Sequence, residues 1–269
     1  VATSSVAVNK FFHTVLSGWV LGAIFVVGVS AWFLLKKRHK EFALQSIKIG
    51  AIFGLVSTLL SAWTGDGSGY QVAKTQPMKL AAMEGYYEGR EGAGLVAVGL
   101  LNPDKEKYND GKDPFIFRVE IPQMLSLLAK RELNAFVPGV KDIIEGGYVQ
   151  KDGTVALSAA EKIERGKKAI AALASYRSAK KEGNTATADS AYVTLQENMA
   201  YFGYGYIKDV HHLVPNVPIT FYAFRIMVML GFYFILFFAV VLFLVYKDKL
   251  AEMKWMHWIA LLTIPLGYI

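Results

Sequence analysis

The sequence contains no cysteine among its 269 residues, so it can form neither a disulfide nor a thiolate metal site. Charged residues are also scarce. Asp, Glu, Lys and Arg together make up 19% of the chain, whereas they supply about a quarter of an ordinary soluble domain. Hydrophobic residues supply 54% and are concentrated in blocks towards the two ends. This composition argues against a simple soluble domain and is typical of a membrane protein.

Long apolar runs mark the predicted membrane segments. They cover residues 11–35, 47–63 and 221–246, and each is close to or above the length of about 20 residues that a spanning helix needs. A further run begins at Trp255 and reaches the end of the chain before attaining that length. Because the chain starts at Val1 without a signal-peptide pattern and stops within this run, we expect it to be a piece of a longer protein.

These runs predict an all-α transmembrane helical bundle with a large, mostly helical loop domain. We predict two transmembrane helices in residues 1–64, the loop domain in residues 65–218, and one transmembrane helix with the start of another in residues 219–269. The links at 36–48 and 247–254 are rich in Lys and Arg, which places them on the cytoplasmic side by the positive-inside rule. The loop domain is then extracytoplasmic.

Charge is distributed unevenly between the links and the loop. From Asp66 to Pro218 the sequence has 19 basic and 19 acidic residues, so the net charge of +7 arises outside this segment, chiefly in the short cytoplasmic links. We therefore expect a lipid bilayer as a partner and no nucleic acid.

The stretch from Asp66 to Glu84 connects the second span to the loop domain. Its glycines at 65, 67 and 69 predict that the span ends in a loop. Residues 77–84 then read as the start of a helix, with proline in the first turn and good helix formers behind it.

Other local patterns lie further along the loop domain. Ser158 and Glu161 have the spacing of a capping box ahead of a helical pattern, and residues 187–199 look like the partner of that helix. Residues 115–122 alternate in a way that predicts a short strand.

Ionisable and sulfur-containing side chains in the spans are the first candidates for chemistry. His13 and Met227 both fall within about the first two turns of the outer ends of their spans, so they can lie at similar depth. A His/Met pair is an established set of axial ligands for an electron-transferring haem. Arg225 is positioned to neutralise a haem propionate. The alternatives are an interfacial histidine bonded to water or a carbonyl, a methionine that merely packs, and Met229 as a competing ligand.

In the loop, the candidates for a functional site are Lys79, Glu84 and Asp66. The ordinary explanation of charged residues at such positions is that they are exposed to solvent on the protein surface. Lys79 and Glu84 are five residues apart and therefore lie on different faces of a helix rather than forming an i,i+4 pair. The glycine cluster lacks the spacing of a phosphate-binding loop. The pair at 211–212 is a weak metal candidate, because no supporting carboxylate or histidine pattern accompanies it.

At these residues the sequence resembles subunit I of the cytochrome bd-type quinol oxidases. The matching motifs are Lys10–Thr14, Gly18–Gly22 and Ser30–Trp32, then Gly65–Tyr70 and Gln76–Glu84, and last Phe221–Val228. Their order and the long loop between the second and third groups also fit, and the resemblance covers most of the chain, with a looser match from about residue 93 to 210.

The resemblance implies a membrane oxidoreductase that oxidises a quinol on the outer face and reduces dioxygen to water. His13 and Met227 would be the iron ligands of a low-spin haem b, with Arg225 beside it. Lys79 and Glu84, with Asp66 as a weaker addition, would form the quinol site. The implied setting is the bacterial cytoplasmic (inner) membrane, with several spans and the large loop outside.

The ligands of the second haem b and of haem d, by the same resemblance, lie outside this sequence. The implied partners are therefore the missing parts of subunit I and a second oxidase subunit. The competing hypothesis is a membrane-anchored sensor or structural protein whose outer domain binds a ligand, in which case His13, Arg225 and Met227 are incidental. A transporter is disfavoured, because no inverted repeat or pair of discontinuous helices is evident.

Overall fold

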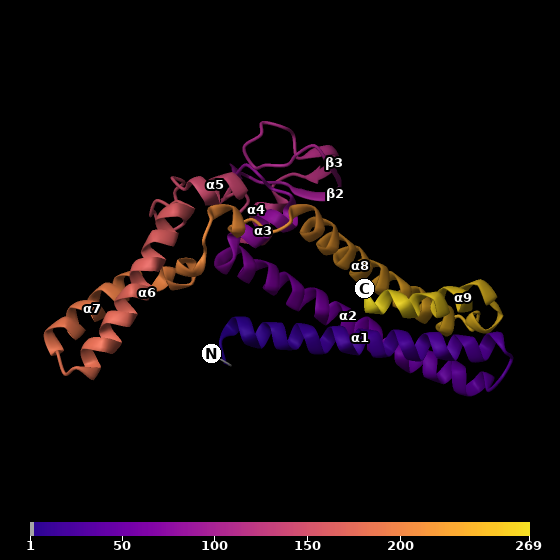
Figure 1. Cartoon of the computed structure of the whole chain (residues 1–269). Helices are drawn as coiled ribbons and strands as arrows, with labels where there is room; N and C mark the ends of the chain where they lie inside the picture. Colours follow the sequence, from indigo (N-terminus) through magenta and orange to yellow (C-terminus); the bar gives the residue numbers. More distant parts are fainter. Residues whose placement is uncertain (1–2) are drawn as a thin grey trace. The chain divides into compact units, whose positions relative to one another are not determined.

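The computed structural model describes residues 3–269 (Figure 1). The chain forms two compact units, one made of Val1–Gln71 with Tyr222–Ile269 and the other of Val72–Phe221. The predicted domain boundaries, at 64/65 and 218/219, fall close to these divisions. The two units are described separately below.

The first unit is a helical bundle. It is built from α1 (Ser5–Leu35), α2 (Lys40–Thr75), α8 (Val217–Tyr246) and α9 (Lys254–Thr263), with α2 and α8 each running on into the second unit. Among residues 3–269, three helical segments are long and apolar enough to cross a membrane, and they contain α1, α2 and α8. This confirms the predicted all-α membrane bundle. The fourth helix is short, as the length of the run from Trp255 predicts.

Large apolar side chains interlock at the centre of this bundle. Ile24 of α1, Ile47 of α2 and Phe238 of α8 are almost completely buried in one cluster. Gly54 of α2 lets the Phe238 ring approach its backbone, because a Cβ at that position would overlap the ring. Small residues at such contacts are the usual means of close helix packing in a membrane, where lipid tails remove the hydrophobic driving force between helices.

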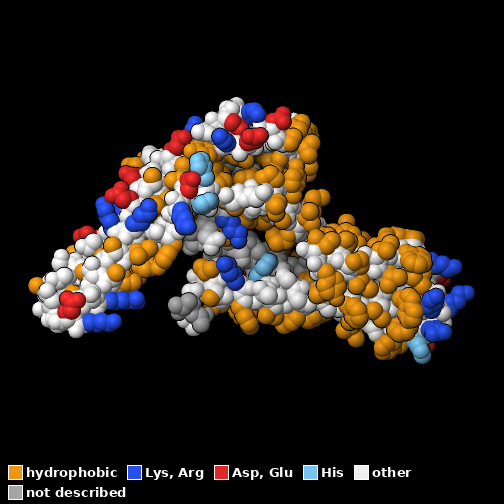
Figure 2. Space-filling view, viewed as in Figure 1, with side chains coloured by type: hydrophobic (Ala, Val, Ile, Leu, Met, Phe, Trp, Pro, Cys, Tyr) orange, Lys and Arg blue, Asp and Glu red, His pale blue; other side chains and the backbone are white. Residues whose placement is uncertain are grey.

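The two basic links meet at one end of the bundle. The α1–α2 connection and the α8–α9 connection lie at the same end in Figure 1, and Lys and Arg side chains gather there in Figure 2. Lys48 near the start of α2 places its Nζ 5.0 Å from the ring centre of Tyr246, the last residue of α8. This common location agrees with the prediction that both links lie on one side of the membrane.

The second unit combines short helices with two small antiparallel sheets. Its elements are α3 (Pro77–Glu84), β1 (Arg90–Glu91), β2 (Leu95–Leu101), β3 (Phe115–Ile121), α4 (Met124–Lys130), β4 (Phe136–Val137), α5 (Val140–Glu145), α6 (Ala159–Lys181) and α7 (Thr185–Asn198). β1 pairs with β4, and β2 pairs with β3. The predicted helix at 77–84 and the predicted strand near 115–122 are confirmed. Strand β2 was not predicted.

Helices α6 and α7 pack as an antiparallel pair at one end of the second unit (Figure 1). Ser158 caps α6: its hydroxyl accepts from the Glu161 amide, and the Glu161 carboxylate accepts from the Ser158 amide. The capping box is therefore confirmed. The α6–α7 contact buries small and aliphatic side chains such as Ala169, Ala172 and Leu195.

The predicted glycine-rich loop at 65–69 is wrong. α2 continues without interruption through Gly65, Gly67 and Gly69 as far as Thr75. The physical reason is tertiary contact with α1: a Cβ at Gly65 would lie 3.4 Å from the His13 ring, and one at Gly67 would lie 3.2 Å from Oδ1 of Asn9. These two glycines thus permit a close helix–helix approach rather than a turn.

Candidate functional site

A polar stripe on α1 faces α2. Asn9, His13 and Ser17 are spaced four residues apart, so they lie on one side of the helix. The Asn9 side-chain amide donates to the Thr64 carbonyl at 3.1 Å and to the Ser68 hydroxyl at 2.7 Å. These bonds pin the outer end of α1 to α2.

His13 is the central member of this stripe. Its Nδ1 lies 3.1 Å from the Ser61 carbonyl oxygen and 3.0 Å from Oγ1 of Thr64. A carbonyl only accepts, and the Thr64 hydroxyl donates its proton to a carbonyl of its own helix, so Nδ1 carries the proton. The other nitrogen, Nε2, then has its lone pair available. This is the arrangement in which a backbone carbonyl orients a metal-ligating histidine.

The sulfur candidates lie on α8 within the first unit. Met227 is 53% exposed and Met229 is 62% exposed, so burial does not distinguish between them as ligands. Gly231, one turn beyond Met227, leaves open space where a side chain would be, which suits the approach of a flat macrocycle to that face. Arg225 is half-buried, and its guanidinium lies 5.4 Å from the centre of the neighbouring Phe224 ring.

The hydrogen bonds given for His13 are made with α2 and not with α8. The pairing of His13 with Met227 as iron ligands is therefore still a prediction. The donor types nevertheless fit a haem: an imidazole held at Nδ1, a thioether exposed on its helix, and a guanidinium two residues before that thioether. Asp66 is exposed on α2, two residues after Thr64.

Two of the loop candidates, Lys79 and Glu84, lie on α3, and they differ in exposure. Lys79 is exposed, whereas Glu84 is 3% exposed and is the last residue of the helix. Gly85 ends α3 with a φ of 63°, a left-handed conformation that glycine adopts without strain. The different exposures agree with the expectation that these two side chains point from different faces and do not form a simple pair.

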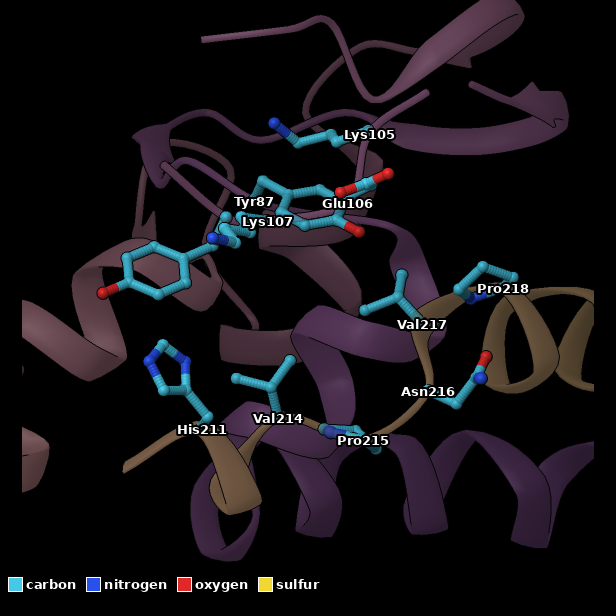
Figure 3. Close-up of a pocket in the computed structure, with 11 residues that line it drawn as sticks. Tyr87, Lys105, Glu106, Lys107, His211, Val214, Pro215, Asn216, Val217 and Pro218 are labelled. Carbon is cyan, nitrogen blue, oxygen red and sulfur yellow. The ribbon is translucent and has the colours of Figure 1, made fainter. Parts of the chain in front are cut away.

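A cavity of about 390 Å³ lies elsewhere in the second unit (Figure 3). Tyr87 and Lys105 line one side of it, and His211, Val214 and Pro215 line the other. A second cavity, of about 590 Å³, extends from Gly85 along the loop. Neither cavity is lined by Lys79 or Glu84, so the assignment of these residues to a quinol site is still a prediction.

The loop between β2 and β3, which borders both cavities, is organised around one lysine. The Lys105 side chain is 5% exposed, and its Nζ donates to Oδ1 of Asp110 and to the Lys112 carbonyl, both at 2.8 Å. The same ammonium lies 4.6 Å from the ring centre of Tyr87. The hydrogen bond from Lys105, supported by backbone amides, holds the pKa of Asp110 well below its usual range.

The weak metal candidate at 211–212 gains no support. Within residues 3–269 there is no cluster of three or more His, Asp or Glu side chains suited to hold a metal ion. His211 instead lies beside Tyr108, with ring centres 6.5 Å apart.

Sequence reasoning missed the residues of α2 that hold His13. Ser61 and Thr64 are three residues apart at the end of the apolar stretch of α2, with Ser57 and Thr58 one turn earlier. Small polar residues at such spacing mark a face that contacts another helix. This signal indicates the contact face without identifying His13 as the partner.

The fold and this geometry define a helical membrane protein in which the imidazole of a histidine near the end of a span is held by the neighbouring helix. The comparison with known families is more specific. The model of the cytochrome bd terminal oxidase subunit I family matches residues 1–269. The chain belongs to that family.

Individual relatives agree. Over 97% of its length the chain is 31% identical to subunit 1 of the cytochrome bd-II ubiquinol oxidase of Escherichia coli K12, of which it covers 49%. Over 50% of its length it is 32% identical to subunit 1 of the cytochrome bd ubiquinol oxidase of Bacillus subtilis 168, covering 27% of that protein. The chain thus spans about half or less of the length of these relatives.

A solved structure was also matched, that of the bd oxidase from Geobacillus thermodenitrificans. The match covers 90% of this chain and 58% of the other, with a TM-score of 0.45 and 20% sequence identity.

Proposed function

We propose that this chain is the part of a haem-containing membrane quinol oxidase that carries the quinol-oxidising loop and the ligands of a low-spin haem b. The supporting observation is His13, whose Nδ1 is held by the Ser61 carbonyl and the Thr64 hydroxyl, which leaves Nε2 as the ligating atom. Membership of the cytochrome bd subunit I family supplies the reaction class.

In this proposal the first unit provides the electron acceptor. His13 Nε2 and the Met227 sulfur would ligate the iron, and the Arg225 guanidinium would balance the negative charge of a propionate. A bound haem supplies an iron that accepts and releases single electrons. The bonds from His13 to α2 hold the imidazole in one tautomer and orientation, so that little rearrangement accompanies ligation.

The second unit provides the proton chemistry. Oxidation of a hydroquinone to a quinone releases two electrons and two protons. The Glu84 carboxylate accepts a hydroxyl proton as general base. The Lys79 ammonium stabilises the hydroquinone anion that forms when this proton leaves. Asp66 adds a further carboxylate on the outer side of the membrane, where the first span begins.

The complete reaction needs more than this chain. Two quinols and one dioxygen give two quinones and two waters, and we assign oxygen reduction to a second haem b and a haem d held by parts of subunit I outside this sequence. A second oxidase subunit completes the complex. We place the assembly in the bacterial cytoplasmic membrane, with the large loop on the outer side. The basic links join the N-terminal end of α2 and the C-terminal end of α8, whereas the loop unit follows the C-terminal end of α2 and precedes α8 in the chain.

Quinol oxidation by the full-length oxidase tests the roles of the loop residues. We expect Lys79→Ala and Glu84→Gln each to lower the quinol oxidation rate by about 10²-fold or more, the usual contribution of a general base or a charge-stabilising group, while the haem absorption bands stay unchanged. Glu88→Gln is the matched control, since Glu88 is a largely exposed carboxylate in the same stretch. Turnover in both variants equal to that of the control would show that neither residue belongs to a quinol site.

A further inference from the structure

The β2–β3 hairpin has one face that is apolar and exposed. Five apolar side chains on this outer face are 42% to 58% exposed: Val98, Leu100, Phe117, Val119 and Ile121. They form one continuous patch, because Val98 lies opposite Val119 and Leu100 lies opposite Phe117 in the register. Figure 2 shows hydrophobic side chains gathered over this part of the second unit.

Two irregularities in the ladder sort the side chains between the faces. The register shifts between Val96 and Val98 and again between Leu100 and Leu101. Each shift changes which face the following side chain occupies. As a result Val96, Leu101 and Phe115 turn inwards and are buried, while the five outer residues remain exposed.

The charged residues of the hairpin lie on its inner face. Glu120 pairs with Arg90, and its other carboxylate oxygen lies 3.5 Å from Nε of Arg118. Glu120 lies opposite Val96 and Arg118 lies opposite Gly99, so both belong to the inner set. The outer face can therefore enter apolar surroundings without burying a charge, which is what contact with a lipid interface requires.

The inner face of the hairpin packs against a residue near the start of α8. Val96, Leu101 and Phe115 form one buried cluster with Phe221, and the rings of Phe115 and Phe221 are 5.6 Å apart. Phe221 lies near the start of α8 and is the first residue of the third apolar run. The inner face of the hairpin is thus packed against the first turns of α8.

From these observations we propose that the outer face of the β2–β3 hairpin inserts into the outer leaflet at the membrane–water interface. The occupant of this face is lipid, because the opposite face of the hairpin packs on Phe221 near the start of α8 and the patch itself contains apolar side chains alone. The hairpin then anchors the loop unit to the bilayer surface. A two-stranded ribbon is marginally stable in water, and the lipid contact gives it the second buried face that it otherwise lacks.

Spin labels in the reconstituted full-length oxidase test this proposal. Phe117→Cys and, independently, Val119→Cys are labelled in a background freed of other cysteines. The protein is placed in vesicles of phosphatidylethanolamine and phosphatidylglycerol. Collisions of the label with oxygen, which concentrates in lipid, are compared with collisions with a water-soluble nickel chelate. Val155→Cys is the control, since Val155 is a comparably exposed apolar residue elsewhere in the second unit.

We expect the oxygen-to-nickel collision ratio at residues 117 and 119 to exceed that at residue 155 several-fold. Equal ratios at all three positions would place the hairpin in water and overturn the proposal. Low collision rates with both reagents at 117 and 119 would also overturn it, because the face would then be covered by protein. Two positions are used so that a local effect of one substitution does not decide the outcome.

Discussion

At the scale of single residues, His13 shows how a helix contact prepares a ligand. Its ring is held by two groups of α2, the Ser61 carbonyl and the Thr64 hydroxyl. A polar group in a membrane helix is costly unless it is bonded, so this arrangement satisfies the histidine before any cofactor binds. The sequence predicted His13 as a candidate from its place in a span. Its partners are 48 and 51 residues away and could not be predicted from local pattern.

The hydroxyl of Thr64 is expected to tune the haem rather than to hold it. An acceptor at Nδ1 increases the electron density on the imidazole and favours ferric iron, so Thr64→Val should raise the midpoint potential of the low-spin haem while the haem is retained. Potentiometric titration of the full-length protein measures this change. Thr14→Val is the control, because the Thr14 hydroxyl donates to its own helix at the Lys10 carbonyl. An equal shift in both variants would contradict a specific role for Thr64.

The choice between the two methionines of α8 is also a residue-scale question. Met227 and Met229 are similarly exposed, so we rely on the spacing with Gly231 and on the family motif. We expect Met227→Leu to abolish the reduced low-spin band in the absorption spectrum and Met229→Leu to preserve it, since leucine conserves volume but cannot ligate iron. The opposite pattern would move the ligand assignment to Met229.

At the scale of elements, short sequence patterns predicted those helices and strands whose formation depends mainly on neighbouring residues. The proline-led helix α3, the capping box of α6 and the alternating strand β3 were all predicted from short patterns. Strand β2 was missed because its residues are a run of apolar side chains interrupted by Gly99, and its pairing with β3 is non-local.

The loop predicted from the glycines at 65, 67 and 69 is helical in the structure. Glycine is the usual residue of a turn, and a cluster of three predicts one. In the structure the flanking contacts outweigh that tendency, because Asn9 bonds to Thr64 and Ser68 across the segment and stabilises it as helix. Tertiary contact overrides propensity here.

The loop around Lys105 is expected to be sensitive to acid. The pKa of Asp110 is lowered by its bond to Lys105, so the stability gained from this bond is present above the ordinary carboxylate pKa and is lost as pH falls towards the lowered value. The amides of Glu106, Lys107 and Lys112 donate to the Asp110 carboxylate and serve as reporters.

Hydrogen exchange corrected for intrinsic rates should therefore show protection of these amides at neutral pH and a loss of protection in acid. In Asp110→Asn the protection should be low at both pH values. Unchanged protection in this variant would show that the loop is held by other contacts.

At the scale of the whole molecule, the chain joins a membrane unit to a polar unit of balanced charge. The predicted boundaries at 64/65 and 218/219 rest on the distribution of apolar runs and basic links. The arrangement of the candidate site was not predictable to the same degree, since Lys79 and Glu84 differ in burial and Glu84 lies inside the loop unit. Exposure depends on which elements pack around α3, and that information is absent from the spacing of the two residues.

The chain also covers about half of the length of its Escherichia coli relative. A spectrum must therefore be measured on the complete oxidase, because the proposed second haem b and haem d depend on residues outside this sequence. The matched control for loss of a histidine is His39, which lies exposed in the basic link between α1 and α2.

The central claim, that His13 is an iron ligand, is tested most directly by the reduced-minus-oxidised absorption spectrum of the full-length His13→Ala variant. We predict that the low-spin haem b band disappears in this variant and persists in His39→Ala. A spectrum of His13→Ala that is identical to that of the unmodified protein would contradict the claim.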